Sequence, residues 1–215
     1  MKKADDSRSA GIMEPIYTVV LAAGASSRLG YNKLLVAIDG ETVIRRALAP
    51  FLRPSIGKVI VVTGNATDAI TRELAGFPLE IIHNKDHAKG MSTSVKASLP
   101  FLAKARGVFF QLGDKPFVAN EIVDVMIKAF FAEQAPIVLP LFKGEKGHPV
   151  LIDIQRYGDE IALLEGDRGL REIIEKHSED VLYIEGEEGN IFDIDSVEEI
   201  NLLRERGYKV EKGKR

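Results

Sequence analysis

Residues 16–33 read IYTVVLAAGASSRLGYNK, an apolar run that ends in small residues and is followed by two cations. Residues 16–23 are β-branched and apolar on both faces, which is typical of a buried parallel strand. Residues 24–27 have no bulky side chain, so their backbone N–H groups can close around an anion. Arg28 can grip phosphate with two hydrogen bonds, and Lys33 adds a mobile point charge. The stretch predicts a binding site for a nucleoside triphosphate.

Two better-known phosphate loops do not fit this stretch. GxGxxG is absent, and Tyr31 and Asn32 stand where a Walker A loop has its Lys and Ser or Thr. The chain is therefore neither a dinucleotide-binding dehydrogenase nor a P-loop NTPase by motif. The alternative for the loop alone is an ordinary strand and glycine turn with solvated basic residues.

The composition excludes several other classes of protein. The chain has 215 residues, of which 45% are hydrophobic, so it can bury one substantial core. Its net charge of −3 does not favour binding to a polynucleotide. It has no cysteine, which excludes a disulfide framework, a thiolate nucleophile and a zinc-thiolate site. No apolar run approaches membrane-spanning length and no secretory signal is recognisable, so we expect a cytoplasmic protein without a membrane partner.

Strands and helices alternate along the chain. We expect a disordered lead over 1–13, one domain over 14–206 and a charged tail over 207–215. The alternation predicts a three-layer α/β/α sandwich with a mostly parallel sheet, which becomes mixed because a short turn joins two of its strands. The expected strands after the first are 58–63, 79–84, 107–112, 136–142, 149–154, 181–185 and 190–194. The expected helices are 42–51, 66–75, 90–105, 120–133, 155–164, 168–177 and 196–206, the last opened by a capping box of Ser196 and Glu199.

Two acidic residues follow predicted strands, and a third lies near the end of one. Asp114 and Asp195 lie where the carboxyl ends of strands would bring them beside the glycine loop. Magnesium takes one or two protein carboxylates together with phosphate oxygens and water, which these two residues can supply. Asp193 is the rival of Asp195 as a ligand. A turn or a helix cap is the common use of Asp at such places.

Further polar residues are candidates for substrate contacts. Ser92, Thr93 and Ser94 follow Gly90 at the start of a predicted helix, where they can bind an anion or cap the helix. His148 can act as a ligand or base, although a lone histidine beside proline is more often structural. Asp167 and Arg171 can form a pair that positions an acceptor, or an ordinary surface ion pair.

LAAGASSRLG and Lys33 together resemble the signature of nucleotidyltransferases with the Rossmann-like GT-A fold. The resemblance is strongest to the branch that attaches nucleotides to molybdenum cofactor, and it extends from about Ile16 to Leu203. Later segments occur in the order of that branch: GMSTSVKAS at 90–98, QLGDKP at 111–116, GHPVL at 147–151, LEGDRGLREI at 164–173 and DIDSVEE at 193–199.

The resemblance implies a role for each matching residue. Asp114 and Asp195 would hold Mg²⁺, with Mn²⁺ as an alternative. Lys33 and Arg28 would bind triphosphate oxygens and, with Asp114, carry catalysis. The residues implied in nucleotide binding are Leu21, Ala22, Ala23, Gly24, Ala25, Ser26, Ser27, Arg28, Lys33, Gly90, Ser92 and Ser94. His148, Asp167 and Arg171 are the candidates for acceptor binding.

The expected activity is magnesium-dependent transfer of a nucleotide to the terminal phosphate of molybdopterin, with release of pyrophosphate. The resemblance favours CTP, because relatives that use GTP tend to carry LAGG where this chain has LAAG, with Ala23 at the divergent position. Alternatives are a guanylyltransferase of the same pathway and a sugar-phosphate or methylerythritol-phosphate nucleotidyltransferase. A different class is a non-catalytic maturation factor that delivers the finished cofactor to a molybdoenzyme apoprotein.

Overall fold

The structure is a computed structural model that describes residues 15–24 and 29–213. Ala25, Ser26, Ser27 and Arg28 of the expected phosphate loop lie outside the described residues, as does the expected lead at 1–13. Among the described helices, none has the length and apolar character needed to cross a bilayer.

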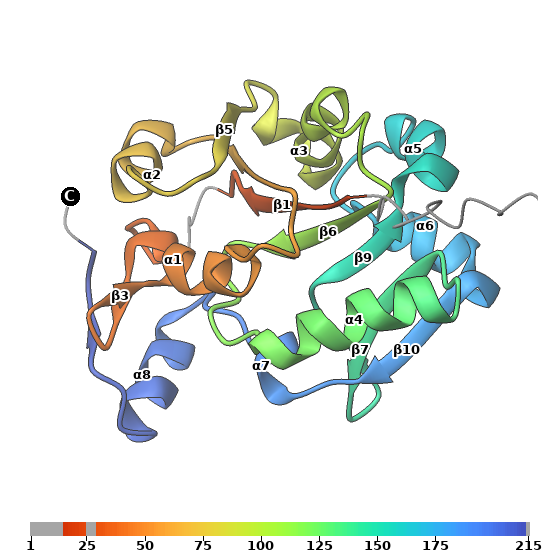
Figure 1. Ribbon diagram of the computed structural model, residues 1–215. Helices are drawn as coiled ribbons and strands as arrows, with labels where there is room; N and C mark the ends of the chain where they lie inside the picture. Colours follow the sequence, from red (N-terminus) through yellow and green to blue (C-terminus); the bar gives the residue numbers. More distant parts are fainter. Residues whose placement is uncertain (1–14, 25–28, 214–215) are drawn as a thin grey trace, which may run out of the picture.

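One large sheet forms the centre of the molecule (Figure 1), with strand order β10-β7-β9-β6-β1-β4-β5 and β8 paired to β7. Strand β9 runs antiparallel to both neighbours, and the other pairs along this order are parallel. The mostly parallel mixed sheet expected from the sequence is therefore confirmed. The strands are β1 (Ile16–Ala22), β4 (Lys58–Thr63), β5 (Glu80–His83), β6 (Gly107–Leu112), β7 (Ile137–Phe142), β8 (Glu145–Lys146), β9 (Val150–Asp153) and β10 (Val181–Glu185).

Helices cover both faces of this sheet, because side chains alternate along the buried strands. On β4, Val59 and Val61 join one core and Ile60 and Val62 join the other. Figure 1 shows α1 and α4 on one side of the sheet and α3 and α5 on the other. The first core contains residues of α1 (Val43–Leu48), α2 (Thr67–Glu73), α4 (Asn120–Ala132) and α8 (Val197–Glu205). The second contains residues of α3 (Met91–Ser98), α5 (Ile154–Ala162) and α6 (Arg171–Lys176). The three-layer sandwich is thus confirmed.

The carboxyl ends of the neighbouring parallel strands β1 and β6 are tied together. Gly113 donates its backbone N–H to the carbonyl of Leu21, 2.9 Å away. The residues that follow β1 and those that follow β6 therefore meet at one edge of the sheet, where the sequence predicts the ligand site.

Two terminal segments differ from the sequence prediction. Residues 190–194 do not form a strand, because the segment holds the helical turn α7 (Glu188–Ile191), in which the Asn190 amide oxygen accepts from the N–H of Glu187. Residues 207–213 are not a free tail, because β11 (Val210–Glu211) pairs with β2 (Ala37–Ile38). With β3 (Glu41–Thr42) these strands form a second, three-stranded sheet, visible in Figure 1 as the C-terminal strand beside the segment that carries β3.

Candidate active site

Three charged side chains converge at the edge of the sheet. Lys33 begins a 3-10 helix (Lys33–Leu35) whose start is fixed by Asn32, the side chain of which accepts from the N–H of Leu34. The Lys33 ammonium lies 2.5 Å from a carboxylate oxygen of Asp114 and also pairs with Asp195. The sequence separates these residues by 81 and 162 positions, and the fold brings them together.

The segment that carries Asp195 is pinned to the turn that carries Asp114. Ile194 donates its N–H to the Asp114 carbonyl at 3.2 Å, and Ile194 is fully buried. The expected capping box follows at once: Ser196 accepts from the N–H of Glu198 and its own N–H donates to Glu199, so α8 begins at a fixed place. These two anchors hold Asp195 opposite Asp114.

The site is partly shielded from solvent. The side chains of Lys33 and Asp114 are 13% and 18% exposed, and that of Asp195 is 40% exposed. Burial acts to lower the pKa of Lys33, but the carboxylates of Asp114 and Asp195 outweigh it and raise this pKa above its usual value. Lys33 is therefore a permanent cation at physiological pH.

Asp114 has an oxygen that the described part of the chain leaves without a hydrogen bond. Its Oδ1 atom is buried and has no partner among these residues, while Oδ2 faces Lys33. A buried acceptor without a donor costs free energy, so such atoms in native proteins are usually satisfied by a ligand, an ion or water. The carboxylates of Asp114 and Asp195, both held at Lys33, form a donor set that suits a hard divalent cation. Asp114 and Asp195 therefore fit the metal that the sequence implies.

Asp193, the rival ligand, has a different partner. It faces Lys115, whose ammonium lies 3.5 Å away and also donates to the carbonyl of Ile191 at 2.6 Å. Burial raises the pKa of Asp193, the nearby Lys115 opposes that effect, and the charges of Asp114 and Asp195 add to it. Asp195 rather than Asp193 therefore stands at Lys33.

A cavity of about 180 Å³ opens above this triad. The sequence predicted Leu21, Ala22, Ala23, Gly24, Lys33, Ser94 and Asp114 as site residues, and all of them line it. Leu34, His87, Met91, Leu112 and Asp167 complete the wall. Most of the wall comes from the ends of β1 and β6 and from the start of α3.

Ser92 does not fit the predicted role in nucleotide binding. Its side chain is fully buried, and its hydroxyl donates to the carbonyl of Glu165 at 3.1 Å. Ser94 is held by Asn84, whose amide nitrogen lies 3.0 Å from the Ser94 hydroxyl and 2.8 Å from that of Thr93. Gly90 precedes the first residue of α3 and is not among the residues that line the cavity. Ser94 is thus the one residue of the predicted Gly90, Ser92 and Ser94 set that lines the cavity.

A second cavity, of about 320 Å³, adjoins the first and contains all three residues predicted for acceptor binding. His148, Asp167 and Arg171 line it together with two further cations, Lys146 and Arg168. Its apolar wall is formed by Leu112, Leu139, Val150, Leu170 and Ile174. The two cavities share Met91, Leu112 and Asp167, so molecules bound in them would meet at this wall.

The charges of this second cavity differ from the sequence expectation in one respect. Asp167 does not pair with Arg171 in the described structure; its carboxylate accepts the backbone N–H of Met91 at 3.0 Å. Burial lowers the pKa of His148 to about 4, with the charge of Lys115 as the next cause. His148 is therefore neutral near pH 7, and the positive charge of this cavity comes from lysine and arginine.

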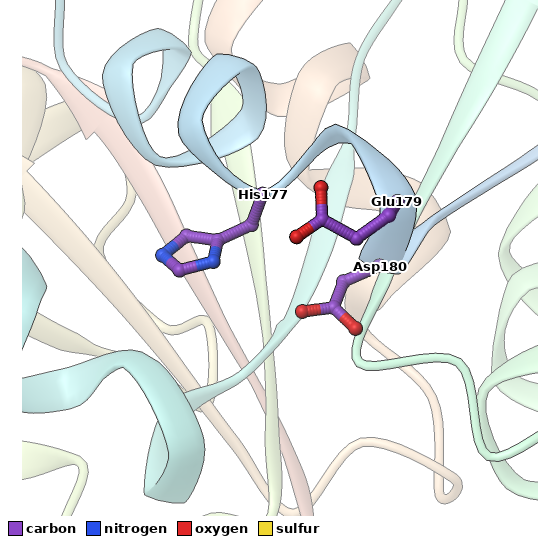
Figure 2. A group of neighbouring side chains, drawn as sticks. All are labelled: His177, Glu179 and Asp180. Carbon is purple, nitrogen blue, oxygen red and sulfur yellow. The ribbon is translucent and has the colours of Figure 1, made fainter.

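A second group of potential metal ligands lies elsewhere, at the turn between α6 and β10. Figure 2 shows that His177, Glu179 and Asp180 point toward one another, and their ligand atoms lie within 4.8 Å. This α6 cluster is already engaged: Asp180 accepts from Arg156 and from the Tyr157 hydroxyl, both at 2.6 Å, and His177 contacts Glu160 at 3.1 Å. It is an ion-pair network that joins α5 to α6.

Several residues in or near the two cavities escape sequence reasoning. Met91 and His87 carry no recognisable signal, because a lone Met or His has many structural uses. Lys115 follows Asp114 directly, yet it is 5% exposed and bonded to α7, which no local pattern indicates. Asn84 ends a predicted strand, and a polar residue at the carboxyl end of a parallel strand is the one available clue.

A family comparison agrees with this geometry. Residues 18–181 match the family described as MobA-like NTP transferase domain. The molybdenum cofactor cytidylyltransferase of Escherichia coli (strain K12) is 31% identical over 141 residues, which cover 65% of this chain and 71% of that protein. A probable molybdenum cofactor guanylyltransferase of Natranaerobius thermophilus is 24% identical over 131 residues, with 60% and 62% covered.

Solved structures share the fold along most of the chain. A homologue of Mycobacterium tuberculosis Rv0371c from Mycobacterium sp. strain JC1 is 30% identical, with a TM-score of 0.77 over 88% of this chain and 96% of that one. Rv0371c from M. tuberculosis H37Rv, solved as a complex with manganese, is 25% identical, with a TM-score of 0.74 and coverage of 89% and 98%. Sequence family, fold and site geometry agree: the chain belongs to the MobA-like NTP transferase family and is a nucleotidyltransferase.

Proposed function

We propose that this nucleotidyltransferase transfers CMP from CTP to the terminal phosphate of molybdenum cofactor and releases pyrophosphate. The observation that carries the proposal is the shared wall between the two cavities, with Lys33, Asp114 and Asp195 in or beside the smaller one. A nucleotide in the first cavity and a phosphorylated acceptor in the second would meet at that wall.

The nucleotide would lie along the end of β1. Backbone groups of residues 21–24 and the hydroxyl of Ser94 would contact the base and ribose, and Lys33 would bind the triphosphate. Residues 25–27 and Arg28 lie outside the described residues. We include them in the nucleotide-binding site on the basis of the sequence alone. Ala23 adds a methyl group to the wall, which favours a pyrimidine over a purine.

A divalent cation held by Asp114 and Asp195, Mg²⁺ or Mn²⁺, would neutralise charge on the triphosphate. The manganese complex of the related Rv0371c supports this proposal. Lys33 is bonded to both carboxylates in the structure, so its ammonium stands within reach of the same phosphate oxygens. Its charge would stabilise the negative charge that grows on pyrophosphate as it leaves.

The acceptor would occupy the second cavity. Lys146, Arg168 and Arg171 offer charge to a phosphate, and the apolar wall suits a flat ring system. An oxygen of the acceptor phosphate would form a bond to the α-phosphorus. The bond from that phosphorus to the oxygen bridging to the β-phosphorus would break, and its electron pair would leave with pyrophosphate. No covalent intermediate with the chain is needed.

Pyrophosphate release tests the proposal. Purified protein is incubated with CTP or GTP, with Mg²⁺ or Mn²⁺, and with or without molybdenum cofactor. We expect release that requires cofactor and is faster with CTP. Faster release with GTP would favour a guanylyltransferase, as in the relative from N. thermophilus. Tight binding of the cofactor without release under any condition would favour a non-catalytic maturation factor.

A further inference from the structure

We infer that Asp167 is a positioning residue that caps helix α3 from a distant loop and so holds the wall between the two cavities in place. This inference rests on the proposed function for its kinetic consequence, but the contacts that carry it are independent of that function. They involve residues 165–167, here called the capping loop, and the first residues of α3.

The first N–H groups of α3 find their partners in the capping loop. A helix leaves its first N–H groups without intrahelical acceptors, and a preceding Ser, Thr, Asp or Asn usually supplies one. Gly90 occupies that position here and has no side chain to do so. Instead, Asp167 accepts from the N–H of Met91 at 3.0 Å, and the Gly166 carbonyl accepts from the N–H of Ser92 at 3.2 Å.

The two segments approach too closely for any other residue at position 90. A Cβ atom on Gly90 would lie 2.3 Å from the Gly166 carbonyl oxygen, and its φ of +113° is a conformation that favours glycine. The Ser92 hydroxyl adds a third bond, to the Glu165 carbonyl. Gly90 and Ser92 thus have a structural explanation: both are needed to bring the capping loop onto α3.

Met91 connects the contact between the capping loop and α3 to the two cavities. It lines both cavities, and a Cβ on Gly169 would lie 3.0 Å from its sulfur atom, so its side chain packs against the same loop region. Asp167 fixes the backbone of Met91, and Met91 forms the wall. A loss of the Asp167 contact should therefore loosen the nucleotide cavity, although Asp167 itself need not touch the reacting phosphates.

Two substitutions separate this role from a charge effect on the substrates. Asp167→Asn removes the negative charge and keeps an oxygen that can accept from Met91, whereas Asp167→Ala removes both. If the carboxylate acts by charge on bound phosphates, the two variants should behave alike. If it caps α3, they should differ.

Hydrogen exchange of the free protein tests the cap without any ligand. We expect the amides of Met91 and Ser92 to exchange about five- to tenfold faster in Asp167→Ala, the size of a lost helix cap, and to stay within about twofold of wild type in Asp167→Asn. Asp159→Ala, which removes an exposed carboxylate from α5, serves as the control and should leave these amides unchanged. Unchanged exchange in Asp167→Ala would overturn the inference.

Calorimetric titration with CTP and Mn²⁺ tests the consequence. The dissociation constant should rise about five- to tenfold in Asp167→Ala and stay close to wild type in Asp167→Asn. Gly90→Ala places a methyl group against the Gly166 carbonyl and so pushes the capping loop away from α3. This variant should also raise the dissociation constant for CTP. Equal weakening by Asp167→Ala and Asp167→Asn would overturn the inference in favour of a direct charge effect. A wild-type protein that binds neither CTP nor GTP would overturn the proposed function, while the exchange result would still decide whether Asp167 caps α3.

Discussion

The sheet-edge cluster of Lys33, Asp114 and Asp195 and the α6 cluster of His177, Glu179 and Asp180 both gather carboxylates around a nitrogen base. They differ in how many hydrogen bonds the surrounding residues donate to their carboxylates. Asp180 receives two hydrogen bonds, from Arg156 and Tyr157, whereas Asp114 keeps a buried oxygen without a donor among the described residues. An unsatisfied buried acceptor costs about 1–3 kcal/mol, so a fold retains it where something outside the chain can compensate. The pattern of missing hydrogen bonds therefore separates a binding site from a structural network of similar composition.

Matched substitutions of the two aspartates should give the largest contrast. Asp114→Asn removes a proposed metal carboxylate with little change in volume, and we expect pyrophosphate release to fall by about 10²-fold or more with an unfolding free energy close to wild type. Asp180→Asn should leave turnover near wild type and lower the unfolding free energy by about 1 kcal/mol, because it weakens the bonds from Arg156 and Tyr157. Steady-state kinetics and urea unfolding measure the two effects. Full turnover of Asp114→Asn at saturating Mg²⁺ would remove Asp114 from the site.

Substitution of Lys33 should affect turnover, whereas substitution of Lys176, beside the α6 cluster, should not. Lys33→Ala is expected to lower kcat at least about tenfold, and to change KM less, because only contacts that strengthen in the transition state raise kcat. Lys176→Ala removes one of the two partners of Glu160 beside the α6 cluster and should change neither constant. If Lys33→Ala raised KM alone, Lys33 would be a binding residue without a catalytic role.

The stability of the protein should depend on pH through His148. Its folded-state pKa is about 4, below the ordinary value of 6.5, so the unfolded chain binds more protons between these values. Unfolding free energy should therefore fall by about 1–3 kcal/mol as pH drops from 6.5 to 4, and His148→Gln should remove that part of the loss. Denaturant unfolding at several pH values measures it. If the unfolding free energy of wild type and of His148→Gln depended on pH equally, groups other than His148 would be responsible for the loss.

Ala23 offers the smallest and most specific test at the sheet edge. The residue is buried and lines the smaller cavity, where we propose that its methyl group narrows the space for a purine. We expect Ala23→Gly to reduce the preference for CTP over GTP by about tenfold or less, the range that a single methyl group allows. Competition between the two nucleotides gives the ratio of kcat/KM values. Preference of the wild type for GTP would contradict the cytidylyl proposal and leave the nucleotidyltransferase family assignment unaffected.

Much of the fold follows from local sequence patterns. The strand at 107–112 and the helix at 120–132 are found where apolar periodicity predicts them, to within a residue. The capping box of Ser196 and Glu199 is also present as predicted. These elements are specified by residues close to one another in the chain, so the sequence alone reveals them.

The errors arise where distant partners decide the structure. Helical turn α7 replaces a predicted strand because Asn190 bonds both to its own turn and to the carbonyl of His148. Thr42 immediately precedes α1, but its hydroxyl donates to Glu73 and makes no capping bond to the helix. Ser92 has the residue type of a ligand-binding cap, yet its hydroxyl faces Glu165. In the same way, Asp114, Asp195 and Lys33 were each predicted as site residues, but the ion pairs that join them are visible only in the folded chain.

The pairing of β11 with β2 has a practical consequence for handling the protein. Val210 lies opposite Ile38, and a side chain at Gly213 would approach the carbonyl of Leu35 to 2.1 Å, two residues after Lys33. Residues 210–213 are thus anchored beside the segment that positions Lys33. A truncation at 207 would remove β11 and so act on that segment.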